Sequence, residues 1–165
     1  MPPAAAITDF EQLKAHPAIA RLSEWDPGCI ESVKFYLDEM TIYVRRSAIR
    51  EACALLRDDP NCQFNFLSDI TCVDWVPSEP RFEIVYHLFS TSSKERVRLK
   101  VPLRGEESAI ESVTSIWPAA NYFEREVFDL FGVRFHGHPY LRRLLMPEDW
   151  EGHPLRKDYP VEGYR

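Results

Sequence analysis

The sequence predicts an α+β fold in which a mostly antiparallel sheet with flanking helices is followed by a long extended C-terminal arm. Two features predict the sheet: runs in which apolar and polar residues alternate, and short links of turn residues between those runs. Crossover-length connections are missing between adjacent runs, which argues against a parallel sheet. After Gly132 neither a helical nor a strand period persists. We therefore expect a globular α+β domain over residues 1–132 and an extended arm over residues 133–165.

The individual elements follow from local signals in chain order. A polar cap opens a first short helix that His16-Pro17 ends, and Asp38-Glu39 divides one alternating run into a hairpin. Apolar residues at helical spacing follow Ser47, and Pro60 closes that helix. We expect helices at residues 8–15, 48–59, 105–116 and 117–132, and strands at residues 31–37, 40–46, 63–76 (one strand or two), 81–91 and 94–103.

The last expected helix carries a dense group of charges. Pro118 lies in its first turn and Gly132 follows it, which is the usual asymmetry of helix ends. Three acidic residues surround Arg125, and this crowding is tolerable when a cation from elsewhere lies among them. The spacing of Arg125 and Asp129 also suits a pair on the helix surface, and a solvated face is the alternative. Cations of a partner protein are candidates as well as cations of the arm. The acidic residues are Glu124, Glu126 and Asp129, and the candidate cations of the arm are Arg142, Arg143, Arg156 and Lys157.

Composition excludes several classes of function. The net charge of −6 is poor for a nucleic-acid binder, whose affinity depends on neutralising phosphates, so we expect no nucleic-acid partner. The four cysteines form no Cys-x-x-Cys pair, which favours reduced buried thiols over a metal or redox motif. No run of 18 apolar residues is present, so any link to a membrane must run through a partner. No phosphate-binding loop or nucleophile motif is visible, and we predict no catalytic residues.

The arm combines features that indicate burial against another protein. It is too rich in aromatic residues and leucine for plain disorder, and its paired cations are interspersed with carboxylates, which suits pairing between proteins better than a polyanion. His136, His138 and His153 could instead form the metal site of an independent enzyme. The simpler interpretation is that Gly137 and Pro139 set a turn and that each histidine hydrogen-bonds the main chain or a carboxylate.

One long stretch resembles a known family. "EREVFDLFGVRFHGHPYLRRLLMPEDWEGHPLRKDYP", residues 124–160, resembles the signature of the C subunit of proton-pumping NADH-quinone oxidoreductase, respiratory complex I. The runs "RFEIVYHL", "RVRLKVPL" and "SVTSIWPAANYFERE" are also similar to that family. Phe128 stands where the family often has tyrosine, and Tyr140 where it usually has Asp or Asn, so local hydrogen bonds there differ from the family pattern.

The resemblance implies a protein without cofactors of its own. The complex would use FMN, iron–sulfur clusters, NADH and quinone, and would couple electron transfer to proton translocation. The resemblance also implies that this chain packs on the D subunit of the complex, which shapes the quinone cavity, with the B and I subunits and the NADH-oxidising subunits nearby. Its location would be the cytoplasmic side of the bacterial inner membrane, as a peripheral protein held through the complex. Catalytic, cofactor-binding and metal-ligating residues are expected to be absent from this chain.

The resemblance and the charge pattern together predict a set of interface residues. The helix residues would hold the arm or the partner, and the arm residues would be the anchors. Two alternatives remain: the equivalent subunit of a related membrane-bound hydrogenase or photosynthetic NAD(P)H dehydrogenase complex, and an independent histidine-based metalloenzyme. The predicted interface residues are Glu124, Arg125, Glu126, Asp129, His138, Arg142, Arg143, Trp150, Arg156, Lys157 and Asp158.

Overall fold

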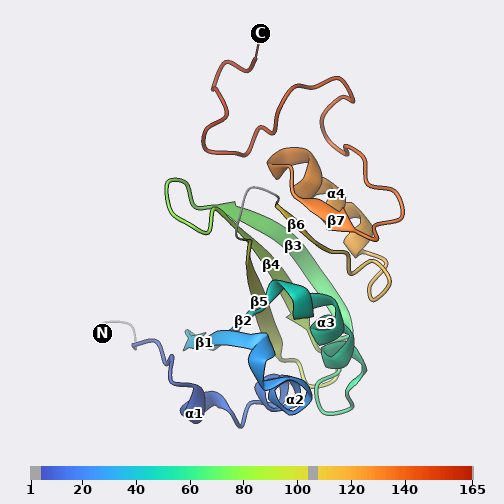
Figure 1. Cartoon of the computed structure of the whole chain (residues 1–165). Coiled ribbons are helices and arrows are strands. Elements are labelled where there is room, and N and C mark those ends of the chain that lie inside the picture. Colours follow the sequence, from blue (N-terminus) through green and yellow to red (C-terminus); the bar gives the residue numbers. More distant parts are fainter. Residues whose placement is uncertain (1–4, 104–107, 165) are drawn as a thin grey trace.

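The computed structural model describes residues 5–103 and 108–164. Its main element is a five-stranded sheet in the order β1-β2-β5-β4-β3, with a separate two-stranded sheet of β6 and β7 (Figure 1). The strands are β1 (Ile30–Tyr36), β2 (Glu39–Val44), β3 (Phe66–Asp74), β4 (Phe82–Phe89), β5 (Arg96–Leu103), β6 (Ala109–Glu111) and β7 (Arg134–His136). The helices are α1 (Phe10–Leu13), α2 (Pro17–Trp25), α3 (Ile49–Asp58) and α4 (Ala120–Phe131).

The main sheet is mixed but mostly antiparallel, which confirms the predicted fold class. β1 with β2, β3 with β4 and β4 with β5 pair antiparallel, as the short links require. β2 and β5 pair in parallel, with Ile42 opposite Leu99. Local turn signals do not predict this pair, because the connection from β2 to β5 contains a helix and two further strands.

Helices cover one face of the sheet. α2 and α3 pack against each other, and α4 packs on β3 (Figure 1). Successive side chains of a strand point to opposite faces of the sheet, so Ile84, Tyr86 and Leu88 of β4 all point into the core. The opposite face carries charged side chains paired across neighbouring strands, such as Lys100 with Glu83 at 2.6 Å.

Two helix predictions are wrong. The segment predicted as a helix at residues 105–116 contains the short strand β6, and residues 105–107 lie outside the described residues. β6 pairs in parallel with β7, with Ile110 opposite Phe135, so a tertiary partner overrides local helix propensity there. The helix α2 is absent from the sequence predictions, because His16-Pro17 indicates a helix end. Proline at the first helical position is well tolerated, however, and the His16 side chain accepts a hydrogen bond from the Ala18 N–H there.

The remaining helices agree with the sequence. α4 ends at Gly132, which has a φ of +78° and adopts the left-handed conformation predicted for a terminator.

The four cysteines are free and buried, as expected. Burial raises the pKa of Cys62 to about 11 and that of Cys72 to about 12, so these thiols are inert at neutral pH. In the described part of the chain no helix is both long and apolar enough to cross a bilayer.

A candidate protein interface around helix α4

Residues 137–164 run around α4 without forming a helix or strand (Figure 1). We refer to this segment as the tail. Asp129 of α4 is fully buried and is the centre of its attachment. Its Oδ2 atom accepts hydrogen bonds from the main-chain N–H groups of Leu144, Leu145 and Met146, at 2.9, 2.7 and 2.9 Å. Its Oδ1 atom pairs with Arg143 at 2.7 Å.

These contacts keep Asp129 ionised. Burial by itself would raise the pKa of this carboxyl, because desolvation disfavours the charged form. The hydrogen bonds from the Met146 N–H, the Arg143 guanidinium and the two neighbouring N–H groups outweigh burial and hold the pKa below its ordinary value. A buried carboxylate with this many donors is stable only while the tail remains docked.

Arg143 links Asp129 to a more distant part of the tail. Its Nη2 atom donates to the main-chain carbonyls of Trp150 and Gly152, at 2.7 and 3.0 Å. Arg143 is one of the arm cations that the sequence offers as candidates for a place among the acids of the helix, and in the structure it pairs with Asp129. The predicted surface pair between Arg125 and Asp129 is wrong, because Asp129 points into the molecule. Arg125 instead donates to the main-chain carbonyls of Arg142 and Arg143, at 3.2 and 3.0 Å.

The second attachment caps the C-terminal end of α4, where helix carbonyls lack partners within the helix. His153 Nδ1–H donates to the carbonyl of Asp129 at 2.8 Å, and the Leu155 N–H donates to that of Leu130 at 3.1 Å. Arg156 Nε donates to the Phe131 carbonyl at 2.6 Å. The Arg156 guanidinium is cationic, and positive charge is favourable at a helix C-terminus.

The third attachment joins the tail to the main sheet. Asp74, at the end of β3, accepts a hydrogen bond from the Lys157 N–H at 2.9 Å. Arg81 pairs with Asp74 at 2.9 Å and with Asp158 at 2.6 Å, so its guanidinium bridges sheet and tail. Burial opposes ionisation of Asp74, but hydrogen bonds from Arg81 and from the Lys157 and Val76 N–H groups hold its pKa below the ordinary value. Sequence reasoning misses Asp74 and Arg81, because no local pattern connects them to a segment more than seventy residues away.

Glu124 has a different role from the one expected. The sequence predicts that it holds the arm or a partner, but its side chain is fully buried beneath α4. Its two oxygens accept hydrogen bonds from the Ser112 hydroxyl and the Val113 N–H, both at 2.7 Å. The carboxylate therefore fixes the segment that follows β6. Burial raises its pKa to about 7, against the smaller opposing effect of these two hydrogen bonds.

The histidines lie in turns and at the helix end. His138 Nε2–H donates to the Asn121 carbonyl at 3.2 Å, and its Nδ1 accepts the Tyr140 N–H at 3.0 Å. The described residues contain no group of three or more His, Cys, Asp or Glu side chains that could hold a metal ion. His138 and His153 thus follow the simpler interpretation, in which each hydrogen-bonds the main chain.

The outer side of the tail differs from its inner side. Whereas the inner side is hydrogen-bonded to α4, several large apolar side chains on the outer side are more than half exposed. Glu126 and Arg142 are also exposed, and the Arg142 guanidinium lies over the Tyr140 ring at 4.3 Å. An apolar surface of this kind on an ordered segment is typical of a protein-binding site. The exposed apolar side chains are Tyr140, Leu145, Leu155, Val161 and Tyr164.

Known proteins resemble this chain over most of its length. A family described as "Respiratory-chain NADH dehydrogenase, 30 Kd subunit" matches residues 42–165. The C subunit of NADH-quinone oxidoreductase from Roseiflexus sp. (strain RS-1) is 48% identical over 143 residues, covering 87% of this chain and 82% of that protein. The protein of the same name from Geobacter sulfurreducens is 43% identical, covering 88% of this chain and 90% of its own length.

Two solved structures share the fold. The trypsin-resistant fragment (1-134) of Nqo5 is 33% identical, with a TM-score of 0.54, and covers 62% of this chain and 83% of its own. A chain of the membrane-bound sulfane sulfur reductase (MBS), an archaeal respiratory membrane complex, is 27% identical, with a TM-score of 0.73, and covers 90% of this chain and 86% of its own. With the family match over three quarters of the sequence, the chain belongs to the family of the 30-kDa subunit of respiratory-chain NADH dehydrogenase.

Proposed function

We propose that this chain is a non-catalytic component of the peripheral arm of an NADH-quinone oxidoreductase, in which its tail holds the neighbouring D subunit of the quinone module. The complex would pass electrons from NADH through FMN and iron–sulfur clusters to quinone and couple this transfer to proton translocation. The B and I subunits and the NADH-oxidising subunits would lie nearby, on the cytoplasmic side of the bacterial inner membrane. The names of the curated relatives support this complex over a hydrogenase or a photosynthetic dehydrogenase.

One observation carries the proposal: the tail is tied down on its inner side and apolar on its outer side. Asp129, Asp74 and the end of α4 hold the main chain of the tail through directed hydrogen bonds. The side chains of Leu145 and Leu155 are left more than half exposed by the same arrangement. Burying such a side chain against another protein is worth about 1.5–3 kcal/mol relative to leaving it in water. Arg143, Arg156 and Asp158 of the tail are used in holding it, which favours a scaffold over a catalyst.

The proposal is tested by changing the outer side of the tail without touching its attachments. In the variant Leu145→Ser with Leu155→Ser, the main-chain hydrogen bonds remain available, so the isolated chain should fold and melt as the wild type does. Association with the D subunit, measured by affinity purification of the tagged full chain from solubilised membranes, should fall at least tenfold, because truncating interface anchors costs about 2 kcal/mol or more.

Leu37→Ser is the matched control. Leu37 is 65% exposed and lies in the turn of the β1–β2 hairpin, at the other edge of the sheet. Unchanged recovery of the D subunit with the double variant would contradict the proposal. Co-purification of a protein with nickel-ligating cysteine pairs would assign the chain to a hydrogenase-type complex instead.

A further inference from the structure

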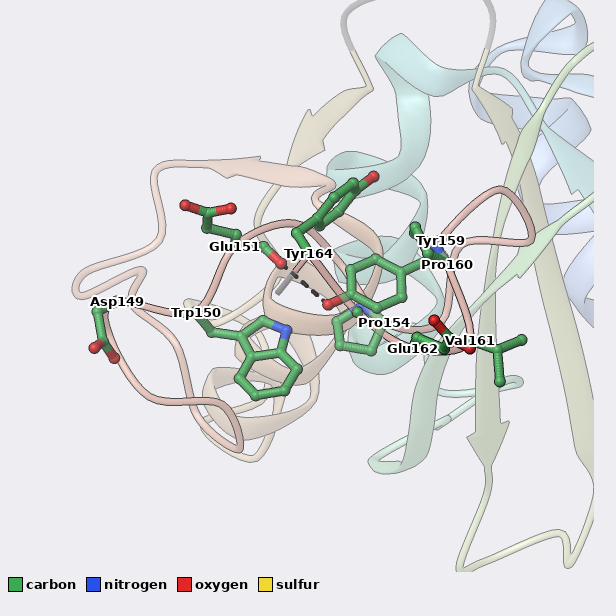
Figure 2. A pocket seen from close by; sticks show the side chains of 10 residues that line it. Asp149, Trp150, Glu151, Pro154, Tyr159, Pro160, Val161, Glu162 and Tyr164 are labelled. Carbon is green, nitrogen blue, oxygen red and sulfur yellow. Dashed lines mark hydrogen bonds between the residues drawn. The ribbon is translucent and has the colours of Figure 1, made fainter.

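The end of the tail folds back on itself around an open hollow of about 660 Å³, which we refer to as the cavity. Figure 2 shows the rings of Trp150, Tyr159 and Tyr164 around this hollow, with the carboxylates on different sides of it. A volume of this size accommodates a large side chain with part of its main chain. The residues that line the cavity are Asp149, Trp150, Glu151, Pro154, Tyr159, Pro160, Val161, Glu162, Gly163 and Tyr164.

The aromatic wall of the cavity is ordered by contacts within the tail. The rings of Tyr159 and Tyr164 meet edge to face, with centroids 5.2 Å apart. The Tyr159 hydroxyl donates to the Glu151 carbonyl at 3.2 Å, which ties the last residues back to the middle of the tail (Figure 2).

Among the described residues, the charged side chains that line the cavity are all acidic. Asp149, Glu151 and Glu162 contribute three carboxylates, and none of the cationic residues that the structure describes lines the cavity. Within the described part of the chain, the ion pairs that involve the tail are those of Arg143 and Arg81, both outside the cavity. Carboxylates beside aromatic faces favour a cation, because the ring faces attract positive charge and the carboxylates pair with it.

We propose that this cavity is a receptor for an arginine side chain of the neighbouring protein in the complex, an inference that rests on the proposed function of the tail. The planar guanidinium stacks on aromatic rings and pairs with carboxylates in a way that a lysine ammonium does not. The cavity therefore selects the partner by charge and shape, while the exposed leucines of the tail add apolar area.

The first experiment removes charge from the cavity while leaving the shape of its side chains unchanged. The variant Asp149→Asn with Glu151→Gln is compared with the control Asp38→Asn with Glu148→Gln. The control changes the net charge by the same amount at exposed positions outside the cavity, and Glu148 is adjacent to Asp149. Rebinding of each purified chain to a solubilised complex that lacks it is measured over a range of salt concentrations.

We expect the cavity variant to bind about tenfold more weakly and to lose much of its salt dependence, whereas the control binds as the wild type does. Equal effects of the two variants would show that only net charge matters and would overturn the inference. No effect of the cavity variant, together with weak binding of the Leu145 and Leu155 double variant, would also overturn it and leave the proposed function standing. If neither variant weakens binding, both proposals fall.

The second experiment identifies the occupant. A photo-crosslinking phenylalanine analogue replaces Tyr164 in the assembled complex, and the cross-linked peptide is sequenced. The expected product is a peptide of the neighbouring protein with an arginine within two residues of the cross-link. A cross-link to a segment without a cation, or to this chain itself, would overturn the inference.

Discussion

Gly132 lies against the tail, and replacing it with alanine tests how the tail is held. A Cβ atom at this position would lie 2.4 Å from Arg156 Nη2 and 2.5 Å from His153 Nε2. Both side chains would have to move, and each of them makes a hydrogen bond to the last turn of α4. Losing one charged and one neutral hydrogen bond costs about 2–4 kcal/mol in total.

The matched control is Gly137→Ala. Gly137 has a φ of +79°, almost the same as the +78° of Gly132, but a Cβ there meets nothing within 4 Å. The strain of placing alanine in the left-handed conformation, about 1–2 kcal/mol, is therefore common to both variants. The difference between them isolates the collision with the tail.

The assay is hydrogen exchange of the Leu155 amide, which donates to the Leu130 carbonyl next to the collision. We expect this amide to lose about a hundredfold in protection in Gly132→Ala, since about 3 kcal/mol corresponds to roughly that change in the opening equilibrium. The same amide should keep its protection in Gly137→Ala. Equal protection in the two variants would refute the assignment of the Arg156 and His153 contacts as attachments of the tail.

Two further predictions concern the buried carboxylates of α4. Asp129→Asn should release the tail at a cost of about 3–5 kcal/mol. In the wild type the attachment is complete above the ordinary pKa of an aspartate, and it should be lost as the pH falls through the depressed pKa of Asp129. Hydrogen exchange of residues 144–146 measures both effects, and persistent protection in the variant at neutral pH would contradict them. The raised pKa of Glu124 favours its protonated form in the folded state. The wild type should therefore lose about 3 kcal/mol of stability as the pH rises from about 4.5 through the pKa of about 7. Glu124→Gln should abolish this loss. Urea unfolding at pH 5 and pH 8 measures this slope, and parallel pH profiles for the two proteins would disprove it.

The accuracy of the sequence predictions depends on how local the signals are. The hairpins and the end of α4 at Gly132 are predictable because alternation, turn residues and a C-terminal glycine act over a few positions. The parallel contact of β2 with β5 and the strand β6 depend on partners far along the chain, so the same signals do not predict them. Local propensity even favours a helix where the structure has the strand β6, Ala109–Glu111.

The candidate site shows the same division. The charge pattern offers a cation of the arm as one candidate partner for the acids of α4, and Arg143 takes that place in the structure. Which acid takes that cation is decided by burial, and burial separates two carboxylates only five residues apart: Asp129 points toward the tail and Glu124 toward the segment after β6. The attachment through Asp74 depends on a hydrogen bond to a main-chain N–H group, which any residue at position 157 except proline could donate. No side-chain pattern can predict a contact of this type.

The use of main-chain donors has a consequence for how the tail can change. Asp129 binds the N–H groups of residues 144–146, so this attachment does not depend on the side chains at those positions. Leu145 is exposed, whereas Met146 packs against the core. The attachment and the exposed surface are therefore chemically independent: one depends on a carboxylate of the body and the other on the side chains of the tail. A family built in this way can alter the surface that meets the partner without losing the fold of the tail, whereas a change at Asp129 or Gly132 disturbs both at once.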